Sequence, residues 1–303
     1  MPRAADRLDA FAMLLLTVLC ATWGLNQVAI KVANSGISPI FQAGLRSAGG
    51  ALLVFLWCRA RGIPLFGRDG TLIPGLVAGA LFAAEFMLIF TGLLYTSAAR
   101  GVVVLYSMPF FVALGAHLFL PAERMTLLRL IGLVAAFLGV CLAFADSIAL
   151  PGGSTIIGDV MMLVAAALWG ATTIVIKASR LAWASAEKTL LYQLGVSAAL
   201  AFPLSLALGE PGIFAPTPLV LGALAFQTVW VVAITYVVWF WMMTRYPAAQ
   251  MSAFAFLTPI FGVLFGGLLL GERVGPYLIA ALALVAAGIY LVNRPRGRAR
   301  PEP

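Results

Sequence analysis

Long apolar runs dominate this sequence and constrain its fold more than any other feature. Of the 303 residues, 63% are hydrophobic and 10% are charged, whereas ordinary soluble domains have roughly 45–50% and about 25%. A chain with so few polar residues cannot cover the surface of a water-soluble globule. It is therefore expected to lie in a lipid bilayer, whose hydrocarbon core of ~30 Å is crossed by about 20 helical residues.

Ten apolar runs have the length of a membrane span. They are residues 11–30, 40–58, 74–94, 99–120, 126–145, 157–177, 186–208, 219–243, 248–270 and 276–293. The turn-rich loop Pro151-Gly152-Gly153-Ser154 divides them into five and five. The expected fold class is an all-α integral membrane protein of ten transmembrane helices, with residues 1–150 as the first half and residues 151–303, including a basic tail, as the second.

An internal repeat relates the two halves. The segment ATWGLNQVAIK at 21–31 is matched by ALWGATTIVIK at 167–177, with Ala, Trp, Gly, Ile and Lys at equivalent places. The segments that contain Pro109 and Pro259 correspond in the same way. Because each half has an odd number of spans, the two copies are expected to cross the bilayer in opposite directions. Inverted repeats around a midplane site are typical of secondary transporters that work by alternating access.

The basic residues predict the orientation. Cytoplasmic loops are enriched in Lys and Arg. If the N-terminus is cytoplasmic, only Lys31, Arg100 and Arg273 of the 19 basic residues lie outside, and Arg46 lies within the membrane. We therefore expect a multi-pass protein of the bacterial inner (plasma) membrane with both termini in the cytoplasm.

Other classes of protein fit the sequence less well. The net charge of +8 comes from basic residues scattered between apolar runs, so no nucleic-acid partner is expected. Cys20, Cys58 and Cys141 lie in apolar runs without C-x-x-C spacing, so no disulfide, metal site or cofactor is expected. No G-x-S-x-G or H-E-x-x-H motif and no acid pair within a span occurs. We therefore do not expect an enzyme, although a polytopic membrane enzyme stays open as the alternative from another class.

Polar and aromatic side chains at bilayer depth mark a candidate substrate site. Trp23 and Trp169 each lie about 18 Å along their spans, near the centre of the bilayer. Two interpretations stay open for them: helix packing with the indole N–H bonded to a neighbour, or the lining of an amino-acid site. The further candidate substrate-binding residues are Asn26, Gln27, Gln42, Thr172, Thr173, Gln193, Gln227 and Tyr236. Such groups are costly in hydrocarbon unless they bond, so each binds substrate or bonds across helices.

Arg46 and Glu85 are the strongly ionisable residues well inside a span. Counted from the ends of their spans, both lie about 12–14 Å below the outer surface. An unpaired charge at that depth is expensive, so the sequence predicts an ion pair. Two roles stay open: a pair that only joins the second span to the third, or an Arg46 that binds a substrate carboxylate in competition with Glu85.

Pro109 and Pro259 each fall about ten residues into a span. A proline there removes a backbone hydrogen bond and bends the helix. The pair is predicted to form hinges or gates, with fixed kinks as the alternative.

The sequence resembles a known transporter family. The segments TWGLNQVAIK and LWGATTIVIK, the segment SPIFQAGLR that opens the second span, and the PAER and LGER segments are similar to those of the EamA branch of the drug/metabolite transporter superfamily. The resemblance implies a ten-helix carrier whose fifth and tenth helices stand outside a cavity lined by the other eight. Within the branch, the chain is most similar to bacterial exporters of amino acids, aromatic ones included, and of related metabolites.

The expected function is therefore the export of neutral or aromatic amino acids and related small metabolites by a secondary-active or facilitative transporter. The expected partners are this small-molecule substrate and the lipid bilayer, with protons as a candidate coupling ion. Efflux of lipophilic drugs is the runner-up, for which more aromatic and fewer amide groups are expected at the depth of the cavity.

Overall fold

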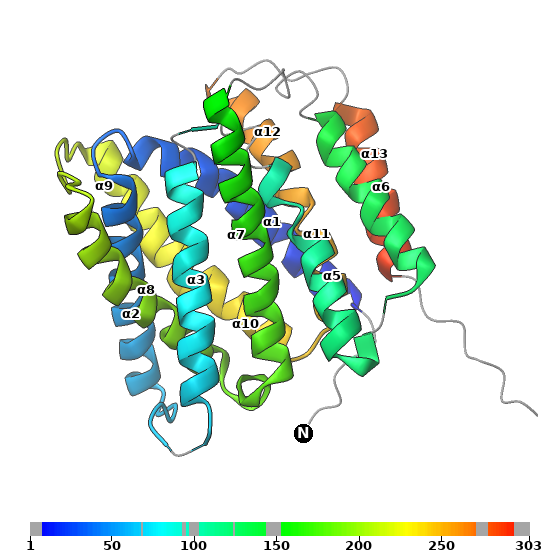
Figure 1. Ribbon diagram of the computed structural model, residues 1–303, viewed down its shortest axis with the longest axis horizontal. Helices are drawn as coiled ribbons and strands as arrows, with labels where there is room; N and C mark the ends of the chain where they lie inside the picture. Colours follow the sequence, from blue (N-terminus) through cyan, green and yellow to red (C-terminus); the bar gives the residue numbers. More distant parts are fainter. Residues whose placement is uncertain are drawn as a thin grey trace, which may run out of the picture.

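The computed structural model describes residues 8–67, 69–92, 95–96, 103–123, 125–143, 153–270 and 278–293. Predictions about Lys31, about the side chain of Gln27 and about residues 97–102, 144–152 and 271–277 fall outside this description. Within it, all regular structure is helical (Figure 1), apart from one antiparallel bridge between Ile37 and Ile213.

Helices follow one another along the described chain. They are α1 (Ala10–Ala33), α2 (Pro39–Ala60), α3 (Leu72–Gly92), α5 (Met108–Phe119), η1 (Pro121–Glu123), α6 (Leu127–Ala143), α7 (Gly153–Ala178), η3 (Arg180–Trp183), α8 (Ala186–Ala207), α9 (Pro218–Ala225), η4 (Phe226–Thr235), α10 (Tyr236–Met243), α11 (Ala248–Phe254), α12 (Leu257–Leu270) and α13 (Leu278–Asn293).

Six helical stretches are long and apolar enough to cross a membrane: Ala10–Ile30, Pro39–Ala60, Leu72–Gly92, Thr155–Ala178, Ala186–Ala207 and Pro218–Met243. Four shorter apolar stretches are Val103–Phe119, Leu127–Leu142, Ala248–Gly262 and Ile279–Asn293. The helical fold of a membrane protein is thus confirmed. That all ten runs cross the bilayer stays a prediction.

Polar caps set several helix starts. The Asp9 side chain accepts a 2.8 Å hydrogen bond from Ala12 N–H at the start of α1. Ser185 caps α8 through Lys188 N–H, and Thr217 caps α9 through Val220 N–H. Each side-chain oxygen satisfies a backbone donor that the first turn of the helix leaves without an intrahelical partner.

The two prolines lie at helix starts rather than in the middle of continuous helices. The backbone turns at Tyr106 and Ser107, and α5 then begins with Pro109 in its first turn. In the other half, α11 ends at Phe254 and α12 begins at Leu257, two residues before Pro259. Proline is tolerated in the first turn because its missing N–H would have no intrahelical partner there. The predicted kinks are therefore breaks, and one occurs in each half.

A π-helical stretch interrupts the helix that runs from Pro218 to Met243. It covers Phe226–Thr235, between α9 and α10. Long π-helical stretches are rare and often lie at functional sites. This one leads directly into α10, which carries Tyr236.

Two helices lie at the edge of the molecule. Helices α6 and α13 pack against each other at one side of the molecule (Figure 1). They are the fifth and tenth apolar runs of the sequence, which the family resemblance places outside the cavity.

Equivalent glycines bring helices together in the two halves. A Cβ on Gly24 of α1 would lie 2.8 Å from both Gly262 N and Phe261 Cβ of α12. A Cβ on Gly170 of α7 would lie 2.7 Å from Phe111 Cβ of α5. Only a residue without a side chain allows these two close helix contacts.

Helices α1 and α7 run in opposite directions. The Tyr246 hydroxyl donates to Asp9, just before α1 begins, over 3.1 Å. Lys177, in the last turn of α7, donates to the Tyr246 carbonyl and forms a 3.0 Å ion pair with Glu123. The start of α1 and the end of α7 thus meet at one end of the molecule.

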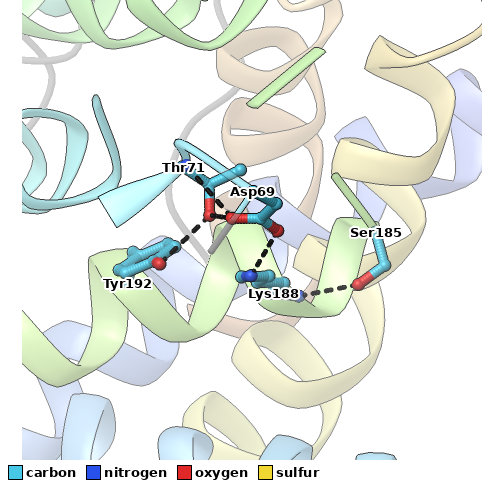
Figure 2. Close-up of polar contacts among 5 residues, drawn as sticks. All are labelled: Asp69, Thr71, Ser185, Lys188 and Tyr192. Carbon is cyan, nitrogen blue, oxygen red and sulfur yellow. Dashed lines mark hydrogen bonds and ion pairs between the residues drawn. The ribbon is translucent and has the colours of Figure 1, made fainter. Parts of the chain in front are cut away.

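A second polar cluster lies at this same end, where the α2–α3 loop meets α8 (Figure 2). Lys188 Nζ lies 2.6 Å from Asp69 Oδ2. The Thr71 hydroxyl donates to Asp69 Oδ1 over 2.6 Å and lies 3.2 Å from the Tyr192 hydroxyl. Lys188 is buried, so Asp69 supplies the counter-charge that a buried ammonium requires.

At the opposite end of the molecule, the Glu210 carboxylate links the loop after α8 to α2. Its two oxygens accept from the backbone N–H groups of Ile40 and Phe41, over 3.1 and 2.9 Å. These N–H groups belong to the first turn of α2, where a negative charge is favoured by the helix dipole. The loop after α8 is thereby fixed to the start of α2.

Candidate functional site

A cavity of about 90 Å³ lies among α1, α3, α7, α8, α10 and the segment just before α5. Since one water occupies about 30 Å³ in the liquid, this volume has room for about three waters or a small solute. Its lining is Trp23, Asn26, Ile30, Phe82, Glu85, Phe86, Ile89, Leu105, Tyr106, Trp169, Thr172, Thr173, Ile176, Gln193, Tyr236, Trp239 and Phe240. Helices α6 and α13 contribute no lining residue in the part of the chain that the structure describes.

Aromatic rings form much of the wall. Trp23 packs edge-to-face on Trp239 and on Tyr236, with ring centroids 5.2 and 6.1 Å apart. Tyr106 and Trp169 form a similar pair at 6.1 Å. Edge-to-face packing fixes ring orientation beyond what burial alone achieves. The wall therefore presents defined ring faces and edges to the cavity.

The two repeat-related tryptophans differ in their hydrogen bonding. Trp23 Nε1–H donates to Thr235 Oγ1 over 2.9 Å, and the Thr235 hydroxyl donates to Val231 O over 2.6 Å. The Trp169 indole N–H has no partner among the described residues. Both side chains line the cavity. Trp23 therefore packs with its N–H bonded and also lines a cavity, and the binding of an amino acid there stays a prediction.

Two threonines of α7 line the cavity with hydroxyls whose hydrogen is already used. Thr172 donates to Leu168 O over 2.9 Å, and Thr173 donates to Trp169 O over 3.1 Å. A hydroxyl has one donor hydrogen and two acceptor lone pairs. In this structure the two threonines can therefore only accept hydrogen bonds from a solute.

Two amides line the cavity with unpaired groups. Asn26 Oδ1 and both polar atoms of the Gln193 amide have no hydrogen-bond partner in the described part of the chain. Both residues are buried. Buried polar groups are costly when unpaired, so these amides are suited to bind a polar solute or water.

Glu85 and Arg46 do not form the predicted ion pair. Glu85 lines the cavity and is 3% exposed, whereas Arg46 is 1% exposed and is not part of the lining. The Arg46 guanidinium carbon lies 4.2 Å from the centroid of the Phe86 ring, and Arg46 Nε and Nη1 have no hydrogen-bond partner in the described part of the chain. The guanidinium remains within electrostatic reach of both Glu85 and Tyr236. Equal depth in the membrane did not bring the two charges into contact, because the guanidinium packs on Phe86 while Glu85 lines the cavity.

Other predicted site residues lie elsewhere. Gln42 Nε2 donates to Gln227 Oε1 over 3.0 Å, and Gln227 Nε2 donates to Ala29 O over 3.3 Å. Neither glutamine lines the cavity, and neither do Pro109 and Pro259. The two glutamines thus bond across helices, which is the alternative that the sequence left open for them.

Several lining residues were missed from the sequence. Phe82, Phe86, Tyr106, Trp239 and Phe240 line the cavity but lie in apolar runs where a buried ring gives no distinguishing signal. Phe82 offers a clue, because it lies three residues before Glu85 and four before Phe86 on α3, and residues three and four apart share a helix face.

The comparisons with known proteins agree with this architecture. The model of the EamA-like transporter family matches residues 10–145 and again residues 156–294. The chain is 26% identical over 272 residues to the uncharacterized transporter YoaV of Bacillus subtilis, covering 89% of this chain and 92% of that one. It is 29% identical over 299 residues to a probable amino-acid metabolite efflux pump of Salmonella typhimurium, covering 94% and 95%.

A solved crystal structure has the same fold. It superimposes with a TM-score of 0.79 at 20% sequence identity and covers 94% of this chain and 96% of its own. The family and the names of the relatives are those of transporters rather than enzymes. Two family matches that together cover most of the sequence show that the chain belongs to the EamA-like transporter family.

Proposed function

We propose that this transporter exports neutral or aromatic amino acids and related small metabolites through alternating access to its central cavity. The observation that carries the proposal is the composition of the cavity, which combines eight aromatic rings with two amides and one carboxylate. Such a lining suits a solute with an apolar or aromatic side chain and a polar head. A relative named a probable amino-acid metabolite efflux pump supports the same substrate class.

The mechanical part of the proposal is an inverted repeat of two five-helix halves. It is supported by the opposite directions of α1 and α7, whose equivalent residues Trp23 and Trp169 line one cavity. Two halves related in this way can exchange conformations around a fixed site. The helix breaks before Pro109 and Pro259 are the proposed hinges, because they recur at equivalent places in the two halves.

The membrane placement is part of the same proposal. We place the protein in the bacterial inner membrane with both termini in the cytoplasm, supported by the distribution of basic residues. The end of the molecule with Tyr246, Lys177 and Asp69 is then the cytoplasmic end. Labelling of single cysteines introduced in the 208–217 loop and the 179–185 loop with a membrane-impermeant maleimide tests this assignment. The 208–217 cysteine should react in intact cells and the 179–185 cysteine only after permeabilisation.

Protons are the proposed coupling ion. The support is Glu85, a buried carboxylate that faces the cavity, where protonation removes a charge that is expensive at this depth. Collapse of an imposed proton gradient across proteoliposomes should reduce concentrative export of substrate. Unchanged accumulation after addition of an uncoupler would contradict coupling and favour facilitated diffusion.

Transport by the purified protein tests the proposed function. Proteoliposomes are loaded with one unlabelled amino acid at a time, and counterflow of the labelled amino acid is measured against empty liposomes. Phenylalanine, leucine and related neutral amino acids should be exchanged, whereas glutamate and lysine should not. Exchange of lipophilic drugs with no exchange of any amino acid would favour the second candidate, drug efflux, which the many aromatic rings of the cavity also fit.

A further inference from the structure

The cavity lining carries several hydrogen-bond acceptors. Glu85 contributes a carboxylate, and Thr172 and Thr173 contribute hydroxyl lone pairs because their hydrogens are bonded to backbone carbonyls of α7. Asn26 contributes an unpaired amide oxygen. A solute that brings several N–H donors finds a partner for each.

The hydrogen-bond donors of the described lining are neutral, and they include the hydroxyls of Tyr106 and Tyr236. The Trp23 indole N–H is bonded to Thr235. The Trp169 indole and the Gln193 amide also line the cavity, and the Gln193 amide is unpaired among the described residues. A solute carboxylate would therefore receive hydrogen bonds from neutral groups only, with no cation among the described lining residues to balance its charge.

The charge of the lining favours a cation. Among the described lining residues, Glu85 is the one ionisable as an acid or base near neutral pH. The Arg46 guanidinium, which would attract a carboxylate, lies behind the lining, over the ring of Phe86. Rings of Trp23, Trp169 and other aromatic residues face the same space, and ring faces attract an ammonium group.

We propose that the cavity recognises its substrate through a protonated amine, held by the Glu85 carboxylate and by Thr172 and Thr173 as acceptors, and that it does not require a substrate carboxylate. The substrate class is thus small amines with an apolar or aromatic side chain, free amino acids included. This inference rests on the proposed function, in which the cavity is the transport site, and it assigns Glu85 rather than Arg46 as the specificity-determining charge.

A series of three ligands of the same aromatic skeleton tests the proposal on the unaltered protein. L-Phenylalanine has both charged groups, 2-phenylethylamine has the amine alone, and 3-phenylpropionate has the carboxylate alone. Inhibition of labelled phenylalanine counterflow is measured in proteoliposomes, and direct binding of labelled phenylethylamine is measured by equilibrium dialysis. We expect phenylethylamine to bind and compete and phenylpropionate to be at least about tenfold weaker, the ratio expected when a hydrogen-bonded charge loses its partner.

Two variants assign the effect to Glu85. Glu85→Gln keeps the shape of the side chain and removes the charge, so affinity for phenylethylamine and for phenylalanine should fall by about tenfold or more. Glu187→Gln is the matched control, because it makes the same change in the first turn of α8, outside the cavity lining. Its affinities should equal those of the parent.

The outcomes separate this proposal from the proposed function. Phenylalanine exchange that phenylpropionate inhibits as well as phenylethylamine does, or that Glu85→Gln leaves intact, overturns amine recognition while the proposed function stands. Binding of phenylethylamine without any exchange of phenylalanine supports amine recognition and overturns amino-acid export. Failure of all three ligands to bind the parent protein overturns both. Because the ligand series needs no variant, a Glu85→Gln protein that does not fold leaves the test intact.

Discussion

Trp23 donates its indole N–H to the hydroxyl of Thr235 over 2.9 Å, from α1 to the end of the π-helical stretch. This bond joins a helix of the first half to one of the second, at the wall of the cavity. The repeat-related Trp169 keeps its N–H unpaired in the described part of the chain. The same residue type thus has a structural bond in one half and an available donor in the other.

The first prediction follows from this difference. Trp23→Phe removes a buried interhelical hydrogen bond, so it should lower thermal stability by about 1 kcal/mol as well as flux. Trp169→Phe breaks no hydrogen bond, so it should lower flux with little change in stability. Unfolding temperatures in detergent and phenylalanine counterflow measure the two effects.

The control for the tryptophan variants is Trp230, which is 46% exposed. Trp241 is less suitable as a control, because it is half-buried and packs under Arg245. Trp230→Phe should leave both flux and stability unchanged. A Trp169→Phe variant that transports like the parent would remove Trp169 from the site.

The glycine contacts give the second prediction. Gly24→Ala and Gly170→Ala place a Cβ within 3 Å of a facing helix, and such overpacking costs roughly 1–3 kcal/mol. Each variant should melt several degrees below the parent. Gly195→Ala and Gly222→Ala are the matched controls, because nothing lies within 4 Å of the added atom; these should melt at or slightly above the parent temperature. Equal stability of all four variants would contradict the close α1–α12 and α7–α5 packing.

The third prediction concerns pH. The hydrogen bond from Lys188, followed by those from Thr71, holds the pKa of Asp69 below its ordinary value of about 3.9. A depressed pKa contributes stability that is fully present above the unfolded-state pKa and is lost as pH falls through the folded one. The parent should therefore melt above Asp69→Asn by a constant margin from pH 8 to about pH 5, and this margin should shrink below about pH 4.

Glu187→Gln is a suitable control for that series, since Glu187 forms no ion pair among the described residues. The melting temperature of Glu187→Gln should equal that of the parent at every pH. A margin for Asp69→Asn that persists undiminished at the lowest pH would show that the ion pair with Lys188 is not its source.

The fourth prediction concerns Arg46 and Glu85. If the two residues formed a direct ion pair, exchanging them in one double variant would preserve that pair. The structure has no such pair, because the guanidinium stacks on Phe86 while the carboxylate faces the cavity. We therefore expect the double variant Arg46→Glu/Glu85→Arg to be inactive in transport. Gel filtration should show no more folded protein for it than for Arg46→Glu or Glu85→Arg alone. Recovery of parental transport would show that a direct pair forms in another conformation.

Much of the fold follows from the sequence, because apolar runs, Ser-Pro and Thr-Pro starts and repeated Trp-Gly motifs each have a local physical cause. The depth of a residue in the bilayer can also be predicted from its place in a span, and on this basis Trp23, Thr172 and Gln193 are predicted as site residues. Depth does not show which way a side chain faces around the helix axis. Gln42 and Gln227 therefore turned out to bond to each other, and the position of Arg46 behind Phe86 was not foreseen.

Most aromatic residues of the cavity wall could not be predicted from the sequence, for a related reason. Phe82, Phe86 and Trp239 occur in runs that are apolar on every face, so no periodicity separates a ring that faces a cavity from one that faces lipid. The helix breaks before Pro109 and Pro259 depend on the turns that precede them, at Tyr106-Ser107 and Ala255-Phe256. A proline shows that a regular helix is disturbed but does not show whether it bends or stops.

Access to the cavity from the two sides of the membrane tests the central claim most directly. Thr172→Cys, in a protein whose Cys20, Cys58 and Cys141 are replaced by alanine, places one thiol on the cavity wall. Membrane-impermeant maleimide is applied from either side of oriented vesicles, with and without phenylalanine. Alternating access predicts labelling from both sides and protection by phenylalanine from each; labelling from one side only, unaffected by substrate, would contradict it.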